Sequence, residues 1–300
     1  MTRGLRREAK LLLATLPLAA MALLAGCAQQ YPRIEIPPAA ADAPMTFDDL
    51  AAVFSQVLDE RGQIDPTALA VHLPRLDRQL ALLARPWPQD VATGQSDQRL
   101  AWLYNARAAW SLRIVAGELR PLDGRRDAFD LPETIDSSRL MGTPFPLNGR
   151  EMTLSAIDEE LTAWGDFRLA ALAPDATDLA GPLPAKPFTA ENARQSLAER
   201  FGELLADPRR LVVDHDYQVV RVPPAIWRAR QGILMEYNYR RSTAQADLLA
   251  ALRSYVAAPA RGRLADAAGY RVEVHRGPAA ISTVRLDWQG RLRRFGPAGN

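Results

Sequence analysis

The feature that most limits what this chain can fold into is its single cysteine, Cys27, among 300 residues. Because a disulfide needs two cysteines, no bridge within the chain can stabilise the fold. The long body of the chain after Cys27 contains no thiol at all. It must therefore fold without covalent cross-links and act without a cysteine.

The first 26 residues have the three parts of a secretory signal peptide. The positive charges of the first part are Arg3, Arg6, Arg7 and Lys10. The apolar run 11–24 that follows is shorter than the ~20 residues that a membrane-spanning helix needs. The next residues, Leu24-Ala-Gly-Cys27, resemble the lipobox of bacterial lipoproteins, in which the cysteine is acylated and becomes the new N-terminus. An ordinary signal peptide followed by a chance cysteine is the alternative.

The lipobox resemblance implies that residues 1–26 are removed and that Cys27 is the lipid attachment site. The partner of the mature N-terminus is then a lipid bilayer of the cell envelope. Ala28 stands where an aspartate would retain the protein in the inner membrane. We therefore expect an outer-membrane location in which the protein faces the periplasm.

The charge of the chain gives no support to nucleic-acid binding. The formal net charge is +2, but residues 1–26 contribute +3, so the remainder is near −1. That remainder has no basic block that could follow a phosphate backbone. We therefore expect no nucleic-acid partner.

The pattern of apolar and breaking residues predicts one helix-dominated α+β domain with a small antiparallel sheet. Residues 27–45 are expected to be the lipidated cysteine and a proline-rich extended tether, and 46–300 the single domain, with a helical front section 46–118 and a remainder 119–300. The first expected helix starts at a capping box at Thr46. The other expected helices are 74–84, 96–118, 153–164, 189–206, one that starts at Pro224, and 244–256. The expected strands are 168–172, a hairpin within 210–222, 270–275 and 281–288, and 119–150 is expected to be irregular.

Four segments carry a resemblance to a known family. The helix Leu100-Ala-Trp-Leu-Tyr-Asn-Ala-Arg-Ala-Ala109 is similar to a motif L-A-F-W-I-N-A-Y-N-A, and Thr153-Leu-Ser-Ala-Ile-Asp-Glu159 is similar to S-L-D-D-I-E-H. The segments 224–227 and 286–288 match a W-Y segment and a closing Y-D-W motif. These motifs belong to the uncharacterised bacterial and plant family numbered 547 among the domains of unknown function, which the chain resembles from about residue 46. The resemblance places Asn105 on the family's first asparagine and Glu159 on a histidine.

A fifth family motif, H-F-A-L-N-C-A-S-x-x-C-P-P-L, is altered in this chain. The register is set by Asp166 and Arg168 at one end and by Pro182-Leu183 at the other. Ala170 then stands at the family's histidine, and Asp175 and Ala180 stand at its two cysteines. If the family performs thiol chemistry, this chain cannot, because both the thiolate and the base that would activate it are missing.

The remaining candidates for chemistry are acidic residues and one histidine. The run from Asp158 through Glu159 to Glu160 could supply a carboxylate pair for hydrolysis, although adjacent acids near a helix start are typical of a solvated face. His215, between two aspartates, could be a metal ligand or a proton shuttle, although its place in a hairpin turn favours a solvated tip. No metal-binding spacing of histidine or cysteine is present, so we expect neither a metal site nor a cofactor.

Two functions follow from these observations. The first is a membrane-anchored envelope lipoprotein whose non-catalytic domain binds or assembles with an envelope protein partner. Its expected pocket residues are Asn105, Glu159, Arg168, Asp175 and Trp227. The alternative is an envelope hydrolase or transferase that uses Asp175, Glu159 or His215. That alternative requires Glu159 and Asp175 to face one concave pocket near Asn105 and Arg168.

Overall fold

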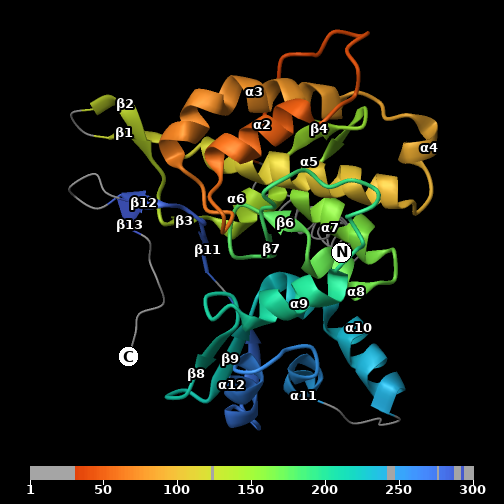
Figure 1. The fold of residues 1–300 in the computed structure, drawn as a ribbon, viewed down its shortest axis with the longest axis vertical. Coiled ribbons are helices and arrows are strands. Elements are labelled where there is room, and N and C mark those ends of the chain that lie inside the picture. Colours follow the sequence, from red (N-terminus) through yellow and green to blue (C-terminus); the bar gives the residue numbers. More distant parts are fainter. Residues whose placement is uncertain (1–30, 123–124, 242–246, 276, 287–291, 294–300) are drawn as a thin grey trace, which may run out of the picture. The chain divides into compact units, whose positions relative to one another are not determined.

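The helix-dominated α+β fold that the sequence predicts is confirmed by a computed structural model, which describes residues 31–122, 125–241, 247–275, 277–286 and 292–293 (Figure 1). The helices are α2 (Asp48–Val57), α3 (Pro66–Ala84), α4 (Gln89–Ala92), α5 (Asp97–Ala116), α6 (Ser137–Gly142), α7 (Leu154–Thr162), α8 (Phe167–Ala171), α9 (Leu197–Ala206), α10 (Pro224–Arg241), α11 (Leu248–Arg253) and α12 (Ala260–Asp266). The strands are β1 (Arg120–Leu122), β2 (Arg125–Asp130), β3 (Thr134–Ile135), β4 (Phe145–Leu147), β5 (Arg150–Met152), β6 (Pro174–Asp175), β7 (Gly181–Pro182), β8 (Val212–Asp214), β9 (Val219–Val222), β10 (Arg271–Val274), β11 (Ala279–Ala280), β12 (Arg285–Leu286) and β13 (Leu292–Arg293).

Helix α5 lies at the centre of the helical packing. Helices α2 and α3 pack on each other, and α3 also packs on α5 (Figure 1). On its other side α5 contacts α7, which leads through α8 to α10. Ser96 caps α5 as expected, because its hydroxyl accepts a hydrogen bond from the N–H of Arg99 at 3.1 Å. Almost every side chain from Leu100 to Ala116 is buried, so α5 is covered on all faces instead of on one.

The start of α2 is stabilised by a side chain of α3 instead of by the expected capping box. The N-cap residue of α2 is Phe47, and no side chain caps it. The fully buried amide of Gln79 accepts a hydrogen bond from the N–H of Leu50 at 3.2 Å and donates one to the carbonyl of Thr46 at 2.9 Å. Backbone groups at the helix start, which no intrahelical bond can satisfy, are thus paired across the α2–α3 interface.

Helix α3 begins at Pro66, earlier than the expected start at Pro74. The carboxylate of Asp65 caps it by accepting hydrogen bonds from the backbone N–H groups of Thr67 and Ala68. Pro74 lies inside the helix, where it has no N–H to donate to the carbonyl of Ala70. The expectation was wrong because a proline usually marks the first turn of a helix, whereas here tertiary packing carries the helix through it.

Two further expected elements differ from the structure. The apolar run after Asp166 is helix α8 and not a strand, because the carboxylate of Asp166 caps it by accepting from the N–H of Arg168 at 3.0 Å. Helix α9 begins at Leu197 and not at Thr189, since Ser196 before it has a left-handed conformation with φ of 63°. The stretch 119–150, expected to be irregular, contains α6 and several short strands.

The strands form small separate sheets. The predicted hairpin is confirmed, with β8 antiparallel to β9 and a turn from His215 to Gln218 between them. The predicted strand at 270–275 is β10, which adds to β9 in parallel and completes a three-stranded sheet. Of the last expected strand, 281–288, only the part up to Leu286 lies within the described residues, and there β12 spans Arg285–Leu286.

The compact unit that holds these elements begins at Arg33. Residues 33–46, here called the strap, were expected to belong mostly to an extended tether before the domain, whereas the compact unit includes them. The N–H of Ile34 donates to the carbonyl of Pro144 at 3.0 Å, and the side chains of Ile34, Ile36 and Met45 pack against the core. The strap contains no helix or strand and turns at residues 41–42, and its apolar side chains gain from burial against the body.

Candidate functional site

The five residues predicted to share a pocket lie in different surroundings. Asn105 and Asp175 are buried, and Glu159 is exposed on α7 beside a hollow of about 300 Å³. Arg168 forms an ion pair with Asp166 at 2.8 Å. Trp227 is half-buried and lines a separate hollow against β10. The arrangement that acid catalysis requires, with Glu159 and Asp175 facing one cavity, is therefore not seen in the described residues.

Asp175 instead belongs to a buried ion-pair network centred on Arg107 of α5, which is fully buried. The Nη1 of Arg107 donates to Oδ2 of Asp175 at 2.7 Å and to the carbonyl of Pro174 at 2.8 Å. Its Nε and Nη2 donate to the two carboxylate oxygens of Asp158 at 2.6 and 3.2 Å. The guanidinium thus binds one carboxylate through two parallel bonds and a second through one.

The remaining acceptors of the network are also satisfied. Oδ1 of Asp175 accepts from both the backbone N–H and the hydroxyl of Thr177, each at 2.7 Å. Arg228 of α10 donates to Oδ2 of Asp158 and reaches the surface, with 41% of its side chain exposed. Two guanidinium groups therefore balance two carboxylates, and the buried network is neutral as a whole.

The buried charge of Arg107 is stabilised by its two acidic partners. Burial alone would lower the pKa of Arg107, but the nearby charges of Asp158 and Asp175 outweigh it and raise the pKa above its usual value. Through their hydrogen bonds to Arg107, Asp175 and Asp158 hold α5, α7 and the β6 segment together.

The structure corrects the interpretation of the acidic run on α7. Asp158 is 2% exposed, and only Glu159 lies on an open face as expected. Glu160 pairs with Arg99 at 2.9 Å and with Arg150. The sequence signal for the network was the charge of Arg107 in the middle of an apolar helix, since a buried charge requires partners.

Asn105 fixes a loop to α5. Its Nδ2 donates to the carbonyl of Phe188 at 3.0 Å, and its Oδ1 accepts from the N–H of the same residue at 2.7 Å. The ring of Phe188 also packs edge-on against Tyr104, with ring centroids 4.9 Å apart. A buried amide needs partners, and here both come from one backbone unit of the loop. Asn105 therefore positions the loop and does not face a cavity.

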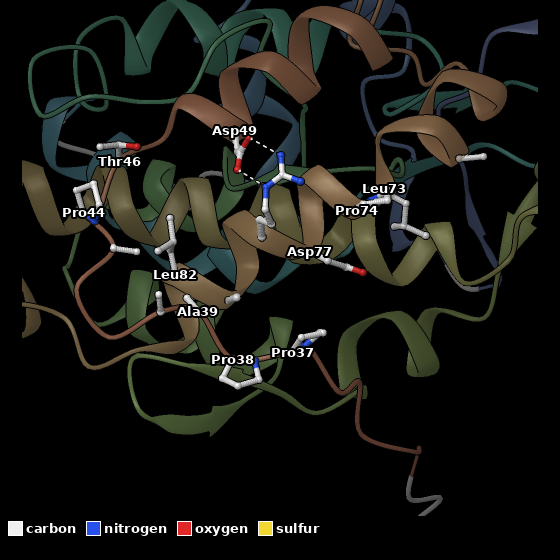
Figure 2. Close-up of a pocket in the computed structure, with 15 residues that line it drawn as sticks. Pro37, Pro38, Ala39, Pro44, Thr46, Asp49, Leu73, Pro74, Asp77 and Leu82 are labelled. Carbon is white, nitrogen blue, oxygen red and sulfur yellow. Dashed lines mark hydrogen bonds and ion pairs between the residues drawn. The ribbon is translucent and has the colours of Figure 1, made fainter.

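A separate apolar groove of about 770 Å³ lies between the strap and helix α3. Sequence reasoning did not find it, because both of its walls come from segments expected to lie apart. In Figure 2 the strap passes Leu82 at one end, and Leu73 and Pro74 lie farther along α3. The lining is formed by Pro37, Pro38, Ala39, Ala40, Ala43, Pro44, Thr46, Asp49, Ala70, Leu73, Pro74, Asp77, Arg78, Ala81 and Leu82.

Arg85, which follows α3, holds the strap wall of the groove in place. Its Nη1 donates to the carbonyl of Ala43 at 2.6 Å and more weakly to that of Ala40 at 3.3 Å. Its Nη2 donates to the carbonyl of Ala41 at 2.7 Å. One guanidinium thus ties three strap carbonyls to the body.

The charged residues at the groove are paired with one another. Arg78 binds both carboxylate oxygens of Asp49, each at 3.1 Å (Figure 2). Asp77 accepts from Arg113 of α5 at 2.6 Å. Because these charges are compensated, the groove presents alanine, proline and leucine surface to an occupant and no uncompensated charge.

The described residues offer no metal site and no membrane-spanning helix. They contain no group of three or more histidine, cysteine, aspartate or glutamate side chains that could hold a metal ion. His215 lies exposed in the turn of the β8–β9 hairpin, as predicted, with its Nδ1 3.0 Å from the hydroxyl of Tyr270. No helix in the described ranges has the length and the apolar character to cross a bilayer. Cys27 lies outside the described residues.

Comparison with known proteins gave no match to this chain, whether against family models, curated proteins or solved structures. Function can therefore be inferred only from the geometry of the sites themselves.

Proposed function

We propose that the chain is a lipid-anchored envelope protein whose non-catalytic domain binds an acyl chain in the groove between the strap and α3. The apolar lining of that groove is the observation that carries the proposal. Its volume of about 770 Å³ falls within the ~300–1,000 Å³ of typical small-molecule sites.

The backbone of the strap favours an acyl chain over a peptide as the occupant. Pro37, Pro38 and Pro44 have no N–H to donate. The carbonyls of Ala40, Ala41 and Ala43 are already bound by Arg85. A peptide strand would leave its own backbone groups unpaired along this wall, at a cost of ~1–3 kcal/mol for each buried group. A hydrocarbon chain has no such groups.

The position of the groove in the chain is consistent with a lipid ligand. We propose that Cys27 is acylated and that the protein is held at the outer membrane, facing the periplasm. Pro37 lies ten positions after Cys27, and ten positions span at most ~35 Å. In a protein anchored at Cys27, Pro37 at the edge of the groove would therefore lie no more than ~35 Å from the lipid attachment site.

The alternative of an envelope hydrolase or transferase receives less support. Asp175 is taken up by Arg107, and His215 lies exposed with Tyr270. We propose that the domain derives from family 547 and has lost its thiol site. At the three family positions stand Ala170, Asp175 and Ala180, each at most 3% exposed, which leaves little room for a replacement catalyst.

The test uses full-length, acylated protein in phosphatidylcholine vesicles with a trace of phosphatidylcholine that bears a diazirine in one acyl chain. After irradiation, the labelled peptides are identified by mass spectrometry. We expect label on residues 37–49 and 70–82. The variant Ala70→Trp, which fills the groove, should lower this labelling about tenfold, the effect of ~1.4 kcal/mol of lost affinity.

The matched control is Ala265→Trp on the exposed face of α12, which should leave labelling unchanged. Equal labelling of both variants, or label spread evenly over the surface, would contradict acyl binding in the groove. The lipid anchor is tested separately by Cys27→Ser, which should release the protein from membranes or trap its precursor. Normal maturation of that variant would contradict the anchor.

A further inference from the structure

A second pocket, which shares no lining residue with the groove, is rich in arginine. It has a volume of about 200 Å³ and is here called the arginine pocket. Its lining comes from separate segments of the chain, namely Arg61, Gly62, Gln63, Leu172, Pro182, Arg200, Glu203, Leu204, Asp207, Arg209, Arg210 and Ser282. The lining thus contains four arginine and two acidic side chains.

Arg200 of α9 is the least compensated of these cations. It forms no ion pair within the part of the chain that the structure describes, and its Nη1 is buried without a hydrogen-bond partner there. Its Nη2 donates a long hydrogen bond, of 3.4 Å, to the carbonyl of Leu172. The guanidinium lies over the rings of Phe188 and Tyr104, 4.9 and 6.0 Å from their centroids.

Arg200 is half-buried, and the burial of its Nη1 without a counter-ion is costly. Burial lowers the pKa of Arg200 below its usual value, and the weaker attraction of Tyr104 and Glu203 does not reverse this. Buried charges in proteins are normally paired, because the loss of hydration is otherwise not offset. A neutralising partner for Arg200 would therefore stabilise the folded protein.

The carboxylates of the pocket do not supply that partner. Asp207 binds Arg209 through both oxygens, with Nη2 to Oδ2 at 2.7 Å and Nε to Oδ1 at 3.0 Å. Arg210, which is 8% exposed, lies 3.7 Å from the same carboxylate and donates to the carbonyl of Ala180. Glu203 is exposed at the rim. Of the side chains that line the pocket, four are positive and two are negative, and neither carboxylate forms an ion pair with Arg200 among the described residues.

We propose that the arginine pocket binds a phosphate monoester group. Planar guanidinium groups bind the oxygens of tetrahedral oxyanions in pairs, which favours phosphate over a halide ion. The pocket volume of about 200 Å³ admits a phosphoryl group and little more. The group can come from a soluble phosphate monoester or from a phospholipid headgroup, and the two sources share this chemistry. The proposal does not depend on the groove between the strap and α3.

The test measures thermal unfolding of the full-length protein in phosphatidylcholine vesicles, with glycerol 3-phosphate or with sodium chloride at equal ionic strength. Glycerol 3-phosphate should raise Tm by about 3–5 °C at roughly ten times its Kd, and chloride should not. In the variant Arg200→Met the affinity should fall about 10- to 100-fold, the range for losing a charged hydrogen-bonding partner. Without ligand, the same variant should have a higher Tm than the wild type, because an uncompensated buried charge is removed.

Arg61→Gln, at an exposed position of the pocket, provides a second variant whose fold is not at risk, and it should also weaken binding. Arg240→Gln is the control, since Arg240 is exposed on α10 and pairs there with Glu236. A Tm rise with glycerol 3-phosphate identifies a soluble source. A Tm rise that occurs only in vesicles containing phosphatidic acid identifies a phospholipid headgroup as the source. Either of these two results supports the proposal. An equal rise in the wild type and in Arg200→Met, or no rise with any phosphate monoester, would overturn it.

Discussion

Arg107 and Asp175 form an ion pair of 2.7 Å in which neither side chain is exposed, although they are 68 positions apart in the sequence. This pair joins the central helix α5 to the segment that follows α8. Because both charges are removed from water, each depends on the other for compensation.

Asp175→Asn should lower the free energy of unfolding by about 3–5 kcal/mol, since it leaves Arg107 buried with one carboxylate fewer. Urea unfolding followed by circular dichroism measures this loss. The control is Glu273→Gln, because Glu273 pairs with Arg271 where both are largely exposed. That change should cost no more than ~0.5 kcal/mol. A loss below ~1 kcal/mol for Asp175→Asn would show that the buried pair is not needed for stability.

Asp166 should make stability depend on acid pH. Burial alone would raise its pKa, but the hydrogen bonds from the side chain and backbone of Arg168 outweigh it and hold the pKa of Asp166 below its usual value. A lowered folded-state pKa contributes stability above the unfolded value of ~3.9 that is lost as pH falls through the folded value. Urea unfolding between about pH 5 and pH 2 should therefore show a steeper loss for the wild type than for Asp166→Asn, which can still cap α8. Parallel curves for the two proteins would refute this linkage.

Asn105→Ala should release the loop around Phe188 from α5. Two buried backbone groups lose their partner, at a cost of about 1–3 kcal/mol each. Limited proteolysis should cut the variant near residues 183–190 faster than the wild type. Asn192→Ala provides the control, because Asn192 is exposed and bonds only locally to Thr189. Similar cleavage of both variants would argue against a bracing role for Asn105.

Arg85→Met should detach the strap without unfolding the body. Hydrogen exchange in residues 33–46 should become at least about tenfold faster, since three bonds to strap carbonyls are lost at roughly 1 kcal/mol each. Exchange in α5 should stay unchanged. Arg78→Met is the matched control, because Arg78 lines the same groove but bonds to the body at Asp49. Unchanged strap exchange in Arg85→Met would show that apolar packing alone holds this segment.

Local sequence signals predicted the fold class and several elements well. Ser96 marked the start of α5, and the residues around His215 marked the hairpin, because caps and turns depend on side chains close in sequence. The same local signals predicted a strand where helix α8 lies, since the apolar run after Asp166 fits either a strand or a helix. Its helical outcome depends on the cap at Asp166 and on packing against α7 and α10.

Contacts between distant segments explain why the sites were harder to predict. Asp158 was interpreted as part of a solvated face because its partner, Arg107, lies 51 positions earlier. The groove was missed because Arg85 reaches back more than 40 positions to the strap. Neither pairing leaves a pattern at short spacing, so each appears only once the chain is folded.

The strap also determines how the domain would respond to mechanical force. A pull applied at the N-terminal end of the body meets Ile34 first and then the strap carbonyls held by Arg85, before it reaches α2. Bonds loaded one after another break singly, so the strap should peel away at low force. Helix α5, bound on all sides, would keep its shape until much higher loads.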